Sequence, residues 1–246
     1  MSGHSKWSTI KRKKEKTDSQ RAKIFTKIGR EIAVAVREGG PDSAANAKLK
    51  DIIAKAKANN VPNDNIDRII KKAAGETGGA QYEEIIYEGY GPSGVAVIVE
   101  TLTDNRNRTA ADMRHYFDKF GGNMGQLGCV GYLFSRVGVL LVDAAGHDED
   151  TLMEAALEAG ASDFLHEDDE LFDIRTAPND IGMVRDALEA LGYSFVSSEA
   201  EYIPSTTVSL TSDDDIKNMT RLLEMLEDNE DVQAVWHNWD APDDEE

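Results

Sequence analysis

Apolar residues in the first third of the chain recur at the helical period. The first series repeats every fourth residue: Ile24, Ile28, Ile32 and Val36. A second series follows at Ala45, Leu49, Ile52, Ile53 and Ala56, and a third at Ile66, Ile69 and Ile70. This spacing predicts three helices joined by short loops, the pattern of a small helical bundle. The glycines at 39 and 40 should end the first helix, Asp42 or Ser43 should cap the second, and the third should stop near Gly75.

After residue 80 the pattern changes to that of strands. Segments 84–88 and 95–102 are rich in Ile, Val and Tyr and predict two strands. The Gly-rich segment 89–94 between them lacks the spacing of a phosphate-binding loop and predicts a hairpin turn. A helix is expected over residues 110–120, and the paired glycines at 121 and 122 end it.

From residue 130 to 203 the elements follow the order β-α-β-β-α-β, which is the ferredoxin-like unit. After Pro204 we expect a strand over 206–210, a helix containing Leu222 and Leu226, and a strand over 232–236. These last elements complete a second sandwich of the same kind with residues 79–129. The predicted fold is therefore α+β: a three-helix domain over 1–78, a discontinuous middle domain over 79–129 and 204–246, and an inserted ferredoxin-like domain over 130–203.

Charge divides the chain at the end of the helical part. Residues 1–78 hold 18 Lys and Arg against 9 Asp and Glu, whereas the remainder holds 9 against 37, and the whole chain carries −19. A basic face attracts phosphate backbones and an acidic body repels them. We therefore expect one end of the molecule to contact a polyanion. The alternative is that the Lys-rich helices are simply solvated.

The candidate contacts begin in a polar arm over residues 1–19. It contains the run Gly3, His4, Ser5, Lys6 and Trp7, followed by Lys11, Arg12, Lys13 and Lys14. The basic side chains can neutralise phosphates, and the indole of Trp7 can stack on a base or a ribose. Trp7 can equally anchor the arm on the bundle, and both interpretations stay open. The polar face of the first helix adds Lys23, Lys27 and Arg30 as candidates.

Several longer motifs carry a family resemblance. They are GHSKW at 3–7, IKRKK at 10–14, NVP at 60–62, YEGYGP at 87–92, TDNRNRT at 103–109, IPST at 203–206 and VWHN at 235–238. On these residues the chain resembles the YebC/PmpR family along essentially its whole length. The resemblance implies a cytosolic protein of a helical domain and two α+β domains around a central cavity. Family members are described mainly as DNA-binding transcriptional regulators, and related mitochondrial and bacterial members as translation activators that act on the ribosome.

A second candidate contact is the cluster Asn105, Arg106, Asn107 and Arg108. Thr109 and Asp112 have the spacing of a capping box, so a helix is expected to start there. Two arginines just before a helix N-terminus would favour a phosphate. The alternative is an arginine network that pins the middle domain to acidic neighbours such as Glu88 or Glu100.

Enzyme chemistry finds little support in the sequence. The five histidines are scattered and the single cysteine, Cys129, is expected to be a small core residue, so no metal or cofactor is predicted. No apolar stretch is long enough to span a membrane, and a cytoplasmic location is expected.

The expected function is a non-enzymatic, nucleic-acid-binding regulator, with DNA-binding transcriptional control as the first hypothesis. The alternative is a translation factor that binds ribosomal RNA or tRNA, with the ribosome or other proteins contacted through the acidic domains. A protein-only adaptor is the least favoured hypothesis.

Overall fold

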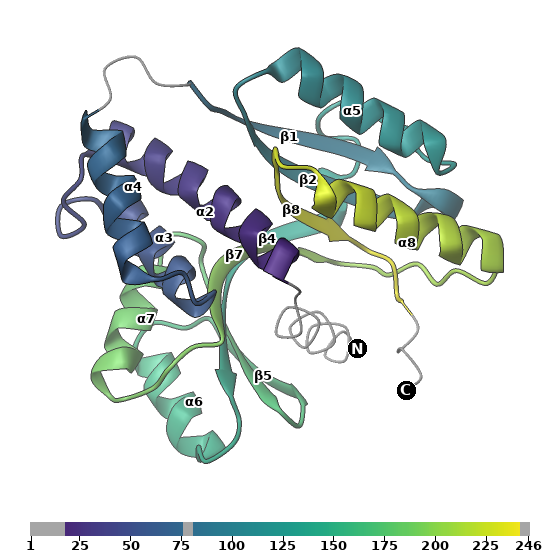
Figure 1. The fold of residues 1–246 in the computed structure, drawn as a ribbon. Helices are drawn as coiled ribbons and strands as arrows, with labels where there is room; N and C mark the ends of the chain where they lie inside the picture. The colour runs from purple at the N-terminus through teal and green to yellow at the C-terminus, as the bar shows by residue number, and fades with distance from the viewer. Residues whose placement is uncertain (1–17, 76–80, 242–246) are drawn as a thin grey trace.

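The computed structural model describes residues 18–75 and 81–241. Its first part consists of three helices: α2 (Asp18–Gly39), α3 (Ala47–Ala58) and α4 (Asn63–Gly75). Helix α2 lies on the side of the first of two sheets, α3 lies beside β7 (Ser197–Pro204) and α7 (Ile181–Ala190) of the second, and α4 lies on the outer side of the bundle (Figure 1). The apolar series predicted from the sequence forms the bundle core, in which Ile32, Leu49 and Ala56 are fully buried.

The junction between α2 and α3 corrects one predicted cap. Gly40 has the expected left-handed conformation, with φ of +85°. The cap of α3, however, is Asn46 and not Asp42 or Ser43, so that prediction is wrong. The Asn46 Oδ1 accepts from the Leu49 amide at 3.0 Å, while its Nδ2 donates to the carbonyls of Ala35 and Gly40. A buried amide can accept and donate at once, which the carboxylate of Asp42 cannot.

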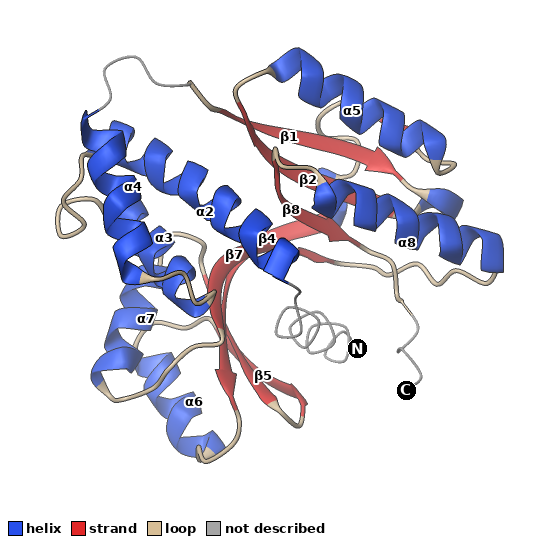
Figure 2. Cartoon of the chain, viewed as in Figure 1, coloured by secondary structure: helices blue, strands red, loops and turns tan. Residues whose placement is uncertain are grey.

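The first sheet has four antiparallel strands in the order β3-β1-β2-β8. The strands are β1 (Glu83–Tyr90), β2 (Ala96–Thr103), β3 (Asn123–Met124) and β8 (Val232–His237). Helices α5 (Arg106–Lys119) and α8 (Asp213–Asp228) cover one face of this sheet (Figure 2). The predicted hairpin turn is confirmed between β1 and β2, where a short 3-10 turn spans Pro92–Gly94.

The expected strand over 206–210 does not form, and that prediction is wrong. Within this segment only Val208 pairs, through a single parallel bridge to Trp239. Its amide donates to the carbonyl of Asn238 and its carbonyl accepts from Asp240, both beyond the end of β8. The segment has the composition of a strand, but no neighbouring strand runs along it to pair with its backbone.

The second sheet is built from β4 (Phe134–Asp143), β5 (Asp163–Asp168), β6 (Leu171–Thr176) and β7 (Ser197–Pro204). Its antiparallel order β5-β6-β4-β7, with α6 (Glu149–Glu158) and α7 (Ile181–Ala190) as crossovers, is that of the ferredoxin-like unit. The α+β class is confirmed. The chain enters the second sheet after β3 and returns to the first at α8, so the first is discontinuous in sequence. The domain limits themselves remain a prediction.

The two sheets share an apolar contact that the helical part lacks. Ala96 and Ile98 of the first sheet pack with Phe134 of the second, and the rings of Tyr202 and Trp236 meet edge to face at 5.0 Å. Cys129, predicted as a core residue, is half-buried against this cluster. Within the described residues, no hydrophobic cluster combines the three helices with either sheet. Polar side chains therefore carry much of the attachment of the helical part.

Candidate nucleic-acid interface

The residues predicted in the arm cannot be placed. Gly3, His4, Ser5, Lys6, Trp7, Lys11, Arg12, Lys13 and Lys14 lie outside the described residues. Their role as phosphate and base contacts stays a prediction, and so does the choice between binding and anchoring for Trp7.

The predicted basic row on α2 contacts the C-terminal end of α8, and Figure 1 shows that end of α8 next to α2. The Lys23 Nζ is 2.7 Å from the Asp228 carboxylate, and the Lys27 Nζ donates to the Glu227 carbonyl at 2.7 Å. Arg30 donates to the Glu230 carbonyl at 2.9 Å and to its carboxylate at 3.1 Å. These three side chains are therefore engaged inside the molecule.

Helix geometry explains why they meet this surface together. Residues four and three positions apart lie on one face of a helix, so Lys23, Lys27 and Arg30 form a row. The C-terminal end of α8 presents unpaired carbonyls and the negative end of the helix dipole, and both favour cations. The signal in the sequence was the acidic run over residues 227–231, which complements the α2 row.

Asp231, just after α8, is the centre of this contact. Its side chain is only 5% exposed, and it accepts hydrogen bonds from four partners: Arg30 at 2.9 Å, Arg108 at 2.7 Å, Thr109 at 2.8 Å and Thr103 at 3.1 Å. Burial opposes ionisation of this carboxyl, but the hydrogen bonds from Arg108, Thr109 and Arg30 outweigh it and lower its pKa. Asp231 therefore holds the helical part, α5 and β8 together as a charged, saturated acceptor.

The Asn105–Arg108 cluster differs from its sequence interpretation. Helix α5 begins at Arg106 with Asn105 as its cap, because the Asn105 Oδ1 accepts from the Arg108 amide at 3.1 Å. The predicted capping box at Thr109 is wrong, since Thr109 is buried and its hydroxyl bonds Asp231. The arginines thus occupy the first turn of α5 and do not precede it.

The two arginines of this cluster have different surroundings. Arg108 pairs with Asp104 at 3.0 Å and with Asp231, and these hydrogen bonds, Asp231 first, raise the pKa of its guanidinium. Its partners are not Glu88 or Glu100, as the structural alternative had expected. Arg106 and Asn107 are exposed in the first turn of α5. Their role in nucleic-acid binding stays a prediction.

Glu88, an expected partner of the arginines, binds backbone amides of the loop after β3. Its carboxylate is buried and accepts three backbone amides, from Gly128 and Val130 at 2.8 Å and from Gly131 at 2.7 Å. A carboxylate so saturated has no capacity for an arginine and fixes the loop that leads into the second sheet.

A second polar junction joins the helical part to the second sheet. The Lys55 Nζ of α3 lies 3.1 Å from Glu31 of α2 and 3.1 Å from Glu199 of β7. Burial opposes the charge on Lys55, but the two carboxylates outweigh it and raise the pKa of the amine. Arg185 of α7, whose side chain is 3% exposed, pairs with Asp51 of α3 at 2.9 Å.

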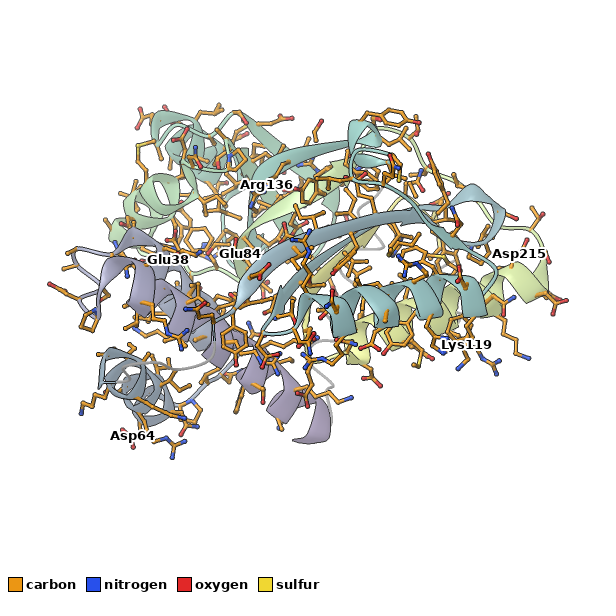
Figure 3. All side chains as sticks on the ribbon, turned by 90° about the horizontal axis from the view of Figure 1, so that it is seen from above. Glu38, Asp64, Glu84, Lys119, Arg136 and Asp215 are labelled. Carbon is orange, nitrogen blue, oxygen red and sulfur yellow. The ribbon has the colours of Figure 1, made fainter. Side chains whose placement is uncertain are left out.

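Further lysines of α3 reach both sheets. Lys48 bridges Glu38 of α2 at 3.0 Å and Glu84 of β1 at 2.8 Å, and these two carboxylates lie close together in Figure 3. Lys50 pairs with Asp186 of α7. Much of the positive charge of the helical part therefore faces the acidic body of the same molecule.

The remaining basic side chains of α3 and α4 are exposed to solvent. They are Lys57 at the end of α3 and Arg68, Lys71 and Lys72 on α4, all exposed. Among the described residues neither Arg68 nor Lys71 pairs with a carboxylate, and Arg68 donates only to the Asn65 side chain at 2.9 Å. Sequence reasoning did not single out these residues, although their basic character was visible in the third helix. What separates Arg68 and Lys71 from the lysines of α2 and α3 is that, among the described residues, neither lies against a carboxylate.

Metal-binding and membrane-spanning features are both absent from the part of the chain that the structure describes. No group of three or more His, Cys, Asp or Glu side chains is arranged to hold a metal ion there. No helix in that part is long and apolar enough to cross a membrane.

Fold and charge together define a class of protein: a basic three-helix part attached by ion pairs to two acidic, antiparallel α+β layers. Residues 5–76 match the profile described as "TACO1/YebC protein N-terminal domain", and residues 82–239 match "TACO1/YebC second and third domain". The chain belongs to the TACO1/YebC family, which confirms the resemblance found in the sequence.

Relatives and a solved structure agree with this membership. A protein of Acetivibrio thermocellus is 59% identical over 97% of this chain and 99% of its own length, and one of Ruminiclostridium cellulolyticum is 58% identical over 100% and 99%. Both are named "Probable transcriptional regulatory protein". The crystal structure of a conserved hypothetical protein from Aquifex aeolicus superposes with a TM-score of 0.81 at 45% identity, covering 92% of this chain and 93% of that one. The names of the relatives describe regulators and not enzymes.

Proposed function

We propose that this protein is a regulator that binds nucleic acid through its helical part. The observation that carries the proposal is the distribution of positive charge. Most basic side chains on the inner faces of α2 and α3 are paired with acidic groups, whereas Arg68 and Lys71 on the outer face of α4 are not. Unpaired Lys and Arg on one face, added to the basic residues of the sequence before α2, supply the sequence-independent attraction to phosphates.

The exposed side of α4 favours contact with the backbone over base readout. Its N-terminal half presents Asp64 and Asp67, and Asp64 is seen at the periphery of the bundle in Figure 3. A recognition helix normally directs its N-terminal residues to base edges in the major groove, where carboxylates would face the negative potential of the duplex. Arg68 follows Asp67 near the middle of the helix, and the basic residues at 71 and 72 lie in the C-terminal half.

The first target we propose is DNA, in keeping with the names of the relatives as transcriptional regulators. The absence of a suitable base-reading surface on α4 favours a second candidate, a translation factor bound to the backbone of ribosomal RNA or tRNA. In either case the acidic sheets are directed away from the polyanion and are available to protein partners.

Titration of a labelled DNA duplex and a matched RNA hairpin tests this proposal. Arg68→Ala combined with Lys71→Ala should weaken binding and flatten the plot of log affinity against log salt by roughly 2 units, about 0.9 for each phosphate that is no longer neutralised. The matched control is Lys217→Ala with Arg221→Ala, two exposed basic residues on α8. If both double variants weaken binding equally, the outer face of α4 does not bind the nucleic acid. The tighter ligand of the parent protein identifies the target class.

A further inference from the structure

The contact between α2 and α8 raises a question about three of the predicted binding residues. Lys23, Lys27 and Arg30 form a row of about 10 Å, given a rise of 1.5 Å per residue. That length spans about three phosphates of one strand at 3.4 Å each. In this structure the row instead binds the carbonyl of Glu227, the carboxylate of Asp228, and the carbonyl and carboxylate of Glu230.

We infer that the C-terminal end of α8 acts as an internal substitute for a phosphate backbone, occupying the α2 row until a polyanion displaces it. The inference rests on the proposed function and adds its regulation. Carbonyls at a helix C-terminus and carboxylates beside them offer the same chemistry as phosphate oxygens: negative acceptors in a line. The row therefore takes a polyanion as its external ligand.

The outer contacts of this interface are of the kind that can be exchanged. The side chains of Asp228 and Glu230 are 65% and 70% exposed, so their ion pairs are hydrated and weakened by salt. No hydrophobic cluster among the described residues holds α2 to α8. The acidic residues also sit at the negative end of the α8 dipole, so neutralising them does not weaken the helix.

Asp231 makes the exchange possible without leaving a buried charge unpaired. When Arg30 leaves, Asp231 still accepts from Arg108 at 2.7 Å and from the hydroxyls of Thr103 and Thr109. Only the exposed acceptors are left without a cation, because Asp231 keeps Arg108. The first sheet is therefore complete with α2 bound or released.

The test compares two double variants that each remove two negative charges. Asp228→Asn with Glu230→Gln removes the acceptors of the α2 row, and Asp118→Asn with Glu154→Gln removes exposed acids on α5 and α6, away from that row. The first should bind the DNA duplex about 5-fold more tightly than the parent, because two exposed ion pairs no longer compete. The second should bind like the parent. Equal gains in both would assign the effect to net charge and overturn the inference.

Two further measurements keep this test separate from the proposed function. Hydrogen exchange of the last turn of α8 should accelerate when the parent binds the duplex, and unchanged exchange in a saturated complex would overturn the inference. Inorganic polyphosphate is titrated in parallel as a phosphate chain without bases. If no nucleic acid binds but polyphosphate favours the Asp228→Asn, Glu230→Gln variant over the control, the proposed function fails and the displacement stands. If polyphosphate does not distinguish the variants, the displacement fails.

Discussion

The helical part meets the two sheets through ion pairs of opposite character. Towards the second sheet two of the cations are enclosed: the side chains of Arg185 and Lys55 are 3% and 24% exposed, and each reaches across to another element, while the Lys50–Asp186 pair beside them is exposed. Towards the first sheet the acceptors Asp228 and Glu230 are mostly exposed. Burial decides what such pairs do, because a buried charge without its partner is costly whereas an exposed one is hydrated. The enclosed junction with the second sheet fixes the bundle, and the exposed junction with the first sheet can exchange ligands.

Asp231 is the exception at the exposed junction and gives the largest expected effect. Asp231→Ala removes the shared acceptor of two arginines and two threonines, and should lower the free energy of unfolding by about 3–5 kcal/mol. Asp228→Ala, three residues earlier at an exposed position, should cost less than about 1 kcal/mol. Urea unfolding of both variants measures the difference. Similar losses would mean that burial does not separate these two carboxylates.

Substitution at the enclosed junction should lower the free energy of unfolding less than substitution of Asp231 does, but more than substitution at any exposed ion pair. Lys55→Met leaves the carboxylates of Glu31 and Glu199 facing each other without a cation, and should cost about 2–3 kcal/mol because the site is only partly buried. Lys23→Met at the exposed junction is the control and should cost less than about 1 kcal/mol. Thermal and urea unfolding under the same conditions compare them. A Lys55 variant as stable as its control would contradict the assignment of this junction as the fixed one.

Acid should act on the Asp231 site in a defined window. Because the folded pKa of Asp231 lies below the usual value of 3.8, its ionised form stabilises the fold above that value, and this contribution is lost as the pH falls through the folded pKa. The stability difference between the parent and Asp231→Asn should therefore be constant above about pH 5 and shrink below about pH 4. Melting temperatures measured from acid to neutral pH test this. A difference that persists unchanged at the acid end would show that ionisation of Asp231 does not stabilise the fold.

The arm should have the smallest effect on stability. Replacing Lys11, Arg12 and Lys13 by Ala should change the free energy of unfolding by less than about 0.5 kcal/mol, as for surface substitutions in general. The same variant should flatten the salt dependence of nucleic-acid binding by roughly 3 units. An unchanged slope would mean that these side chains do not meet phosphates.

The elements of this fold were predictable wherever the apolar period is long. The apolar residues from Ile24 to Val36 repeat at the helical period and so predict a helix. The order β-α-β-β-α-β after residue 130 likewise predicts the second sheet and its two helices. The Asn46 cap was not predictable, because its side chain also bonds the end of α2. The Asn105 cap is local, and the expectation of a helix start at Thr109 missed it. Asn46 bridges the end of α2 to α3, and Asn105 caps a helix whose first turn contains two arginines. The segment around Val208 has strand composition but no neighbouring strand to pair with.

The candidate site was harder to predict for the same reason. The sequence indicates which residues are basic, but not which of them face carboxylates of the same chain. Lys23 and Arg68 are alike in the sequence, and only the fold shows that Lys23 faces Asp228 while Arg68 faces outward. The buried role of Thr109 was equally hidden, since its partner Asp231 is 122 positions away.

Mapping where nucleic acid crosslinks to the protein tests the central claim most directly. Ultraviolet crosslinking in cells, followed by sequencing of the bound strand and mass spectrometry of the modified peptides, identifies both the target and the contact. We expect crosslinked peptides from the arm and from α2, α3 and α4, with residues 57–72 prominent, and none from α6 or β5 of the second sheet. Crosslinks concentrated on the second sheet, or no bound nucleic acid at all, would contradict the account.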